Sequence, residues 1–119
     1  MTTREVPQAE WETTLNRVCE GAITRHVTVD VLAPDVGAQR LVTHLPLIGL
    51  EVSSQAGRPA TIAITTAPED PDTMPFIHVV ARPAHVFLEE DAEGALHALD
   101  IEDEGHTKTL LMFDQASAA

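Results

Sequence analysis

The sequence predicts an α+β domain that is mainly β, with one N-terminal amphipathic helix packed on a small antiparallel barrel or bent sheet of about six to seven strands. Three observations lead to this fold class. A helical period of about 3.6 is confined to residues 7–20, a period of two dominates after Gly21, and turn-forming residues separate the alternating segments. Each strand follows the previous one through a short turn, which favours antiparallel pairing.

The size and composition indicate one globular domain over residues 1–119. Apolar residues make up 44 % of the chain but aromatic residues only 3 %, so Val, Leu, Ile and Ala must form the core. Residues 1–5 and 115–119 carry no pattern that ties them to this core, and we expect both ends to be frayed.

The segment PQAEWETTLNRVCE at residues 7–20 predicts the helix. Pro7 suits a first helical position, acidic residues follow in the first turn, and Gly21 suits the C-terminal cap. Apolar residues at spacings of four, three and four form one stripe that faces the core. This stripe comprises Trp11, Leu15, Val18 and Ala22, and Cys19 beside it is expected to be a small buried residue.

The first half of the β region contains three expected strands. Val27, Val29 and Val31 alternate with polar residues, and APDVGA at residues 33–38 forms a turn. Residues 40–54 form a long extended segment, which Pro46 and Gly49 interrupt, so this strand should bend or bulge from one sheet into another. Residues 60–66 form the next strand, with Ile62 and Ile64 on one face.

The second half is expected to contain two hairpins. The segment APEDPDTMP at residues 67–75 has three prolines and three acidic residues, which indicates an exposed loop. Residues 76–90 then predict a hairpin that turns at residues 81–83, and residues 95–113 predict a second hairpin.

The charge of the chain limits the classes of partner. With 19 acidic and 7 basic residues the net charge is −12, so a phosphate backbone is repelled and direct nucleic-acid binding is not expected. A surface this acidic favours a basic protein partner. Cys19 is the only cysteine, no apolar leader or membrane-spanning run is present, and we therefore expect a cytoplasmic protein that does not bind membranes.

Acidic residues concentrate near the C-terminus, and this raises the possibility of a cation site. A helix-loop-helix calcium loop starting at Asp100 is rejected, because its twelfth position is Leu111 and its flanks alternate with period two. The alternatives are a weak cation site and an acidic interaction patch. Eight acids define the expected patch: Glu89, Glu90, Asp91, Glu93, Asp100, Glu102, Asp103 and Glu104.

Six histidines suggest a metal hypothesis, although none forms a recognised metal motif. If residues 76–90 form a hairpin centred on Ala81 and Arg82, then His78 and His85 face each other across the strands and are the candidate metal ligands. With Arg82 and His44, they are also the candidates for a small-ligand pocket.

Four stretches resemble an uncharacterised bacterial family of domains of unknown function (family 5335). They are REVPQAEW at residues 4–11, APDVGAQ at 33–39, LPLIGLEV at 45–52 and ALDIEDEGHTKTLLMF at 98–113. The resemblance implies a self-contained bacterial domain, with no established activity, cofactor or site.

The sequence contains no nucleophile elbow and no glycine-rich phosphate loop, so we expect a protein that is not an enzyme and needs no cofactor. The preferred hypothesis is a small acidic protein-interaction domain, as a monomer or a homodimer. The alternatives are an acidic mimic that inhibits a nucleic-acid-binding protein, and a metal or small-ligand binding domain.

Overall fold

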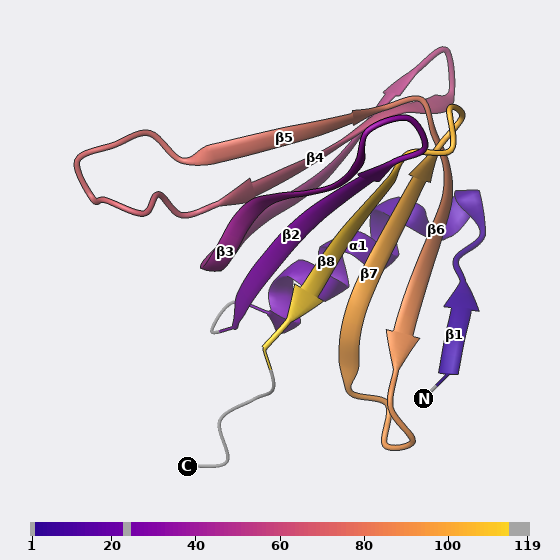
Figure 1. The fold of residues 1–119 in the computed structure, drawn as a ribbon. Coiled ribbons are helices and arrows are strands. Elements are labelled where there is room, and N and C mark those ends of the chain that lie inside the picture. The colour runs from indigo at the N-terminus through magenta and orange to yellow at the C-terminus, as the bar shows by residue number, and fades with distance from the viewer. Residues whose placement is uncertain (1, 23–24, 115–119) are drawn as a thin grey trace.

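The described part of the chain forms one open, eight-stranded antiparallel sheet with a single α-helix against it (Figure 1). The computed structural model describes residues 2–22 and 25–114. The strand order is β1-β6-β7-β8-β2-β3-β4-β5, and all pairs are antiparallel. In chain order the elements are β1 (Thr2–Glu5), a 3₁₀ turn (Gln8–Glu10), α1 (Trp11–Gly21), β2 (His26–Ala33), β3 (Gly37–Gln55), β4 (Arg58–Thr66), β5 (Phe76–Ala81), β6 (Pro83–Glu90), β7 (Leu96–Asp103) and β8 (Lys108–Phe113).

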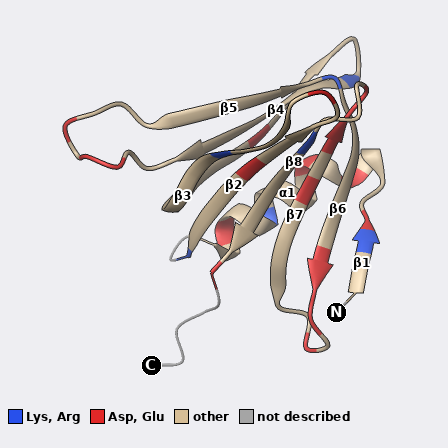
Figure 2. Ribbon diagram, in the orientation of Figure 1, with Lys and Arg blue, Asp and Glu red and all other residues tan. Residues whose placement is uncertain are grey.

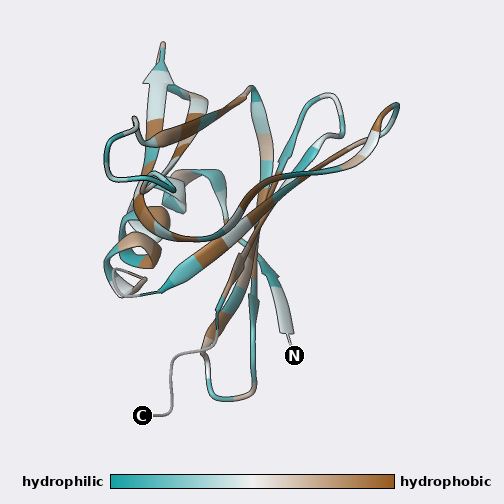
Figure 3. Cartoon of the chain, turned by 60° about the vertical axis from the view of Figure 1, so that its left-hand side comes forward, coloured by the Kyte–Doolittle hydropathy of each residue, from teal (hydrophilic) through white to brown (hydrophobic). Residues whose placement is uncertain are grey.

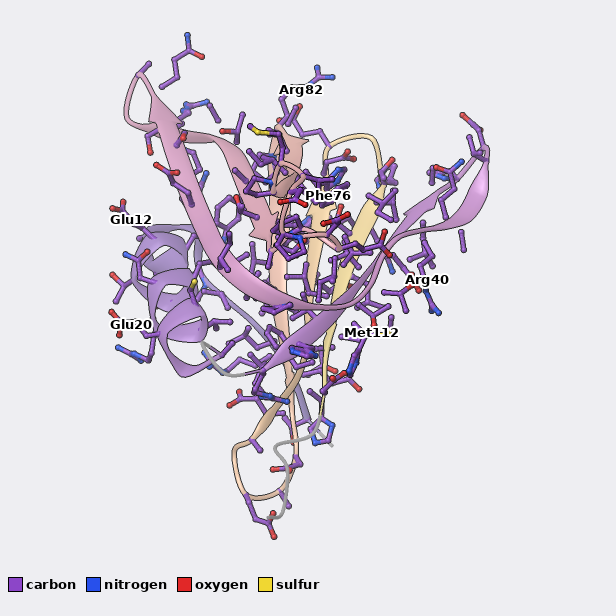
Figure 4. All side chains as sticks on the ribbon, turned by 90° about the vertical axis from the view of Figure 1, so that its left-hand side faces the viewer. Glu12, Glu20, Arg40, Phe76, Arg82 and Met112 are labelled. Carbon is purple, nitrogen blue, oxygen red and sulfur yellow. The ribbon has the colours of Figure 1, made fainter. Side chains whose placement is uncertain are left out.

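The core lies between α1 and the inner face of the bent sheet, as Figure 3 shows from the side. The predicted helix is confirmed: Trp11 and Leu15 are buried, and Val18 packs against the core. Figure 4 shows Glu12 and Glu20 pointing away from the sheet. Alternate residues of the strands, at the expected period of two, complete the aliphatic core. They include Val27, Val29, Ile62, Ile64, Leu99, Ile101 and Leu111.

Strand β3 bends as the sequence predicts. Its first part pairs with β2 and its second part with β4, and the register shifts between Leu47 and Gly49. The sheet therefore bends sharply, and in Figure 1 the nearly horizontal strand β5 lies at a large angle to the steep strands β6 and β7.

The expected hairpin at residues 76–90 is wrong. Strand β5 pairs only with β4, and β6 pairs with β1 and β7, so β5 and β6 are not neighbours. Arg82 turns the chain with a φ of 52°, donates its N–H to the Ala60 carbonyl at 3.0 Å and accepts from the Glu104 N–H at 3.1 Å. A type I′ hairpin turn needs positive φ at both central residues, which Pro83 cannot adopt, and here Arg82 and Pro83 form a corner between two parts of the sheet.

The sheet does not close into a barrel. A barrel requires its edge strands to pair, but β1 and β5 are the two free edges of this sheet. Of the two expected forms, the bent antiparallel sheet is confirmed and the barrel is wrong, and the sheet has eight strands instead of about six to seven.

The eighth strand is β1, at residues expected to be frayed. It pairs with β6 from Thr2 opposite Glu90 to Glu5 opposite Phe87. The Val6 N–H then bonds to the Val86 carbonyl at 2.8 Å, and side chains add contacts from Glu5 to His85 at 2.8 Å. The expectation for residues 115–119 lies outside the described residues.

Neither helical segment among the described residues has the length and apolar character needed to span a membrane.

Candidate functional sites

Strand β5 is an edge whose outward side chains are apolar and exposed. Ile77 is 61 % exposed and Val79 is 51 % exposed, whereas Val80 on the inner face is buried. Met74, in the loop that enters β5, is 84 % exposed. Residues 74–81 include no charged residue, and the preceding loop carries Glu69, Asp70 and Asp72. The edge therefore combines a free strand, apolar side chains and an adjacent negative loop.

The expected acidic patch separates into two groups at opposite ends of β7. Glu89, Glu90, Asp91 and Glu93 lie at the β6–β7 connection, and Glu102, Asp103 and Glu104 lie at the β7–β8 turn. The eight residues of β7 span roughly 25 Å at the usual rise per residue. Figure 2 shows acidic segments at these two ends and also on the β4–β5 loop. An acidic mimic of nucleic acid needs carboxylates along one ridge, and this distribution does not favour that function.

Several of these carboxylates stabilise local structure. The Asp91 carboxylate accepts from the backbone N–H groups of Glu93 and Ala95, both at 2.9 Å, and these bonds, led by the one from Ala95, lower its pKa. The Asp103 carboxylate likewise accepts from Gly105 and Thr107, both at 2.9 Å. Each acid closes a turn, which is a sufficient structural reason for its presence.

Asp100 differs from the other acids because it is half-buried in the middle of β7. Its Oδ1 atom has no hydrogen-bond partner among the described residues. Burial raises the pKa of its carboxyl group, the nearby Lys108 opposes that rise, and Glu102 and Glu89 add to it. A carboxyl group in this position is costly to ionise.

The hairpin on which the His78 and His85 metal pair depended does not form. His78 lies on β5, where its Nε2 atom is 3.5 Å from the Thr109 hydroxyl of β8, and burial lowers its pKa. His85 lies on β6, exposed, with Nδ1 at 2.8 Å from the Glu5 carboxylate. The structure thus gives each histidine a different neighbour, on β8 and on β1.

A different group of histidines does come together. His26 at the start of β2, His44 in β3 and Asp114 after β8 each offer one ligand atom, and these atoms all lie within 4.8 Å of one another. The His44 Nδ1 atom is 2.7 Å from the Asp114 Oδ2 atom. The His26 and His44 rings meet edge to face with centroids 4.5 Å apart.

The sequence patterns did not bring these three residues together. His26 and His44 were two of the six histidines behind the metal hypothesis, but the predicted metal pair was His78 and His85, and Asp114 was not a candidate. One signal was present in the sequence: the apolar alternation breaks between Val42 and Leu45, which are three positions apart instead of two. That break marks a β-bulge, and a bulge redirects a side chain.

A pocket of about 400 Å³ between α1 and the β6–β7 connection is lined by three of the seven basic residues, Arg4, Arg17 and Arg25. Arg4 pairs with Glu90 at 3.3 Å, and the Arg25 guanidinium donates to the Asp114 carbonyl and lies over the Phe113 ring. Of these three, Arg17 alone has no ion-pair or hydrogen-bond partner within residues 2–22 and 25–114. One free guanidinium is a weak basis for an anion site.

The fold and these sites define a small acidic domain built on a bent open sheet, with an unprotected edge at β5. The chain belongs to DUF5335, a family of unknown function, whose family model matches residues 2–119. The resemblance seen in the sequence is therefore confirmed. No match to a curated protein or to a solved structure was found.

Proposed function

We propose that this chain is a non-enzymatic protein-interaction domain that binds an extended segment of a basic partner along β5. The observation that carries the proposal is the free edge of β5, whose exposed side chains, Ile77 and Val79, are large and apolar. An added strand is a common way for such an edge to bind a peptide, because the main-chain groups of the edge supply ready hydrogen-bonding partners.

The two edges of the sheet differ in a way that supports this choice. Natural edge strands are usually protected by charged residues, by short length or by bulges. Strand β1 has four residues, and two of them, Arg4 and Glu5, are charged and paired with side chains of β6. Strand β5 has six residues, no charge and an unbroken register with β4. Only β5 is therefore suited to accept another strand.

The chemistry of the partner follows from the surroundings of β5. Glu69, Asp70 and Asp72 lie in the loop that leads to this strand, and the whole chain carries −12. A segment with alternating apolar residues would cover Ile77 and Val79, and Lys or Arg at its end would meet the acidic loop. Burying the exposed half of each apolar side chain contributes about 1 kcal/mol, in addition to the main-chain hydrogen bonds. A second copy of this chain fits less well, because its own charge is also −12.

The test uses a synthetic peptide of alternating Val and Lys residues as the probe, with hydrogen exchange of the backbone amides as the readout. The expected result is slower exchange in residues 76–81 when the peptide is added. Protection only outside β5 would contradict the proposal. Protection of β5 that depends on protein concentration alone, without peptide, would assign this edge to a homodimer instead.

A pair of matched variants separates strand addition from general charge attraction. Val79→Asp adds a negative charge on β5, so nonspecific attraction to a basic peptide would become stronger, whereas strand addition would become weaker. Val36→Asp makes the same change at a position that is 67 % exposed in the β2–β3 turn. We expect weaker peptide binding for Val79→Asp alone, measured by fluorescence anisotropy. Equal or tighter binding by this variant would overturn the proposal.

A further inference from the structure

We propose that His26, His44 and Asp114 form a binding site for one divalent transition-metal ion of the Zn²⁺ class. This site is separate from the β5 edge and does not depend on the proposed interaction. Two imidazoles and one carboxylate are a donor set that binds Zn²⁺ and similar transition-metal ions. Imidazole is a better ligand for these ions than for Mg²⁺ or Ca²⁺, which prefer oxygen ligands.

The positions of the three donors fit such an ion. In a tetrahedral Zn²⁺ site, bond lengths near 2.1 Å place the ligand atoms roughly 3.4 Å apart. Here the ligand atoms lie within 4.8 Å of one another, and the distance from the His44 Nδ1 atom to the Asp114 Oδ2 atom is 2.7 Å. Small side-chain rotations are enough to bring all three donors onto one ion.

Hydrogen bonds hold the backbone of each donor residue in place. The Asp114 N–H donates to the His26 carbonyl at 3.0 Å, and Arg25 Nε donates to the Asp114 carbonyl at 2.8 Å. The His44 N–H donates to the Thr28 hydroxyl at 3.3 Å. A bound ion would therefore link the start of β2, the middle of β3 and the end of β8.

His44 also adopts a backbone conformation that non-glycine residues seldom take. Its φ is 56°, at the bulge where the β2–β3 register shifts between Val27 and Val29. A non-glycine residue in this region is strained, and such residues concentrate at functional sites. The conformation turns the His44 ring toward Asp114 and His26, where an ion would be shared.

The site is open to solvent on one side. The side chain of His44 is 63 % exposed and that of Asp114 is 35 % exposed. An ion can therefore enter from solution, and a water molecule can complete the four-coordinate shell that three protein ligands leave open.

The test is calorimetric titration of ZnCl₂ into protein that carries no affinity tag and has been treated with a chelator. We expect one equivalent to bind, with changes in the NMR signals of the His26 and His44 rings. His44→Gly removes a ligand but keeps the positive φ, so the fold is preserved, and it should weaken Zn²⁺ binding by at least about tenfold.

His106→Gly is the matched control. His106 also has a positive φ, 67°, and its ring also contacts a carboxylate, that of Glu102, at 3.4 Å. Zn²⁺ binding should be unchanged in this variant. The proposal is overturned if the natural chain binds no Zn²⁺, if His44→Gly binds as tightly as the natural chain, or if both glycine variants lose affinity equally.

Discussion

The single tryptophan provides the sharpest test of how the core is held together. Trp11 is 2 % exposed, and its indole Nε1 donates to the Val6 carbonyl at 2.9 Å, where Val6 is equally buried. This bond links α1 to the segment that continues from β1. Trp11→Phe keeps an aromatic ring in the core but removes the donor.

The expected loss of stability has two parts. A buried carbonyl that loses its donor costs about 1–3 kcal/mol. The smaller ring leaves a cavity that adds about 1 kcal/mol. The free energy of unfolding should therefore fall by about 2–4 kcal/mol, which is a large share of the 5–15 kcal/mol typical of a domain. At about 4 °C per kcal/mol, the melting temperature should fall by about 8–16 °C.

The assay is urea unfolding followed by far-ultraviolet circular dichroism, with an unchanged m-value as the sign that both variants unfold alike. Thr13→Ala, at an exposed position of the same helix, is the control and should change stability by less than about 0.5 kcal/mol. A loss below about 1 kcal/mol for Trp11→Phe would show that the indole bond does not hold α1 in place.

Three further predictions concern charge and backbone strain. Burial raises the pKa of Asp100 above 3.8, so the unmutated chain loses stability as the pH rises from 3.8 through the raised pKa. Asp100→Asn should therefore be more stable than the unmutated chain at pH 7, and chemical unfolding should show this advantage shrinking toward pH 4. An advantage that stays constant with pH would contradict this. Burial lowers the pKa of His78 below 6.5, so the stability of the fold should fall as the pH drops below 6.5. His78→Gln should remove that part of the pH dependence. Identical stability profiles against pH for the two chains would refute this prediction. Arg82→Gly should raise stability by about 1 kcal/mol in thermal unfolding, because glycine adopts the φ of 52° without strain. A loss of stability would show that contacts of the Arg82 side chain stabilise the fold by more than the strained backbone destabilises it.

Local patterns in the sequence predicted most elements and their types. The 3.6 period of residues 7–20 predicted α1, the break at Pro46 and Gly49 predicted the bend in β3, and the alternation of residues 95–113 predicted the hairpin of β7 and β8. Each of these features depends on residues close together in the chain, which is why a local pattern can specify them.

The errors concern contacts between residues far apart in the chain. Residues 2–5 have no apolar alternation, and they are ordered because β6, more than eighty residues later, offers them a free edge. The hairpin expected at residues 76–90 had two apolar runs and a short connection, but its pairing partners were β4 and β7 instead of each other. Hydrophobic alternation specifies which face of a strand is buried and does not specify which strand lies beside it.

Periodicity and composition were enough to predict a mainly β, acidic chain with an aliphatic core and one helix, because they specify burial and the type of each element. They did not predict which strands are edges, that the acids near residues 89–104 form two separate groups, or that His26, His44 and Asp114 lie together. These features arise from pairing between strands that are far apart in the chain. They also depend on the bulge at His44 and the corner at Arg82, where the backbone angle of one residue redirects the chain and so changes the neighbours of the residues that follow.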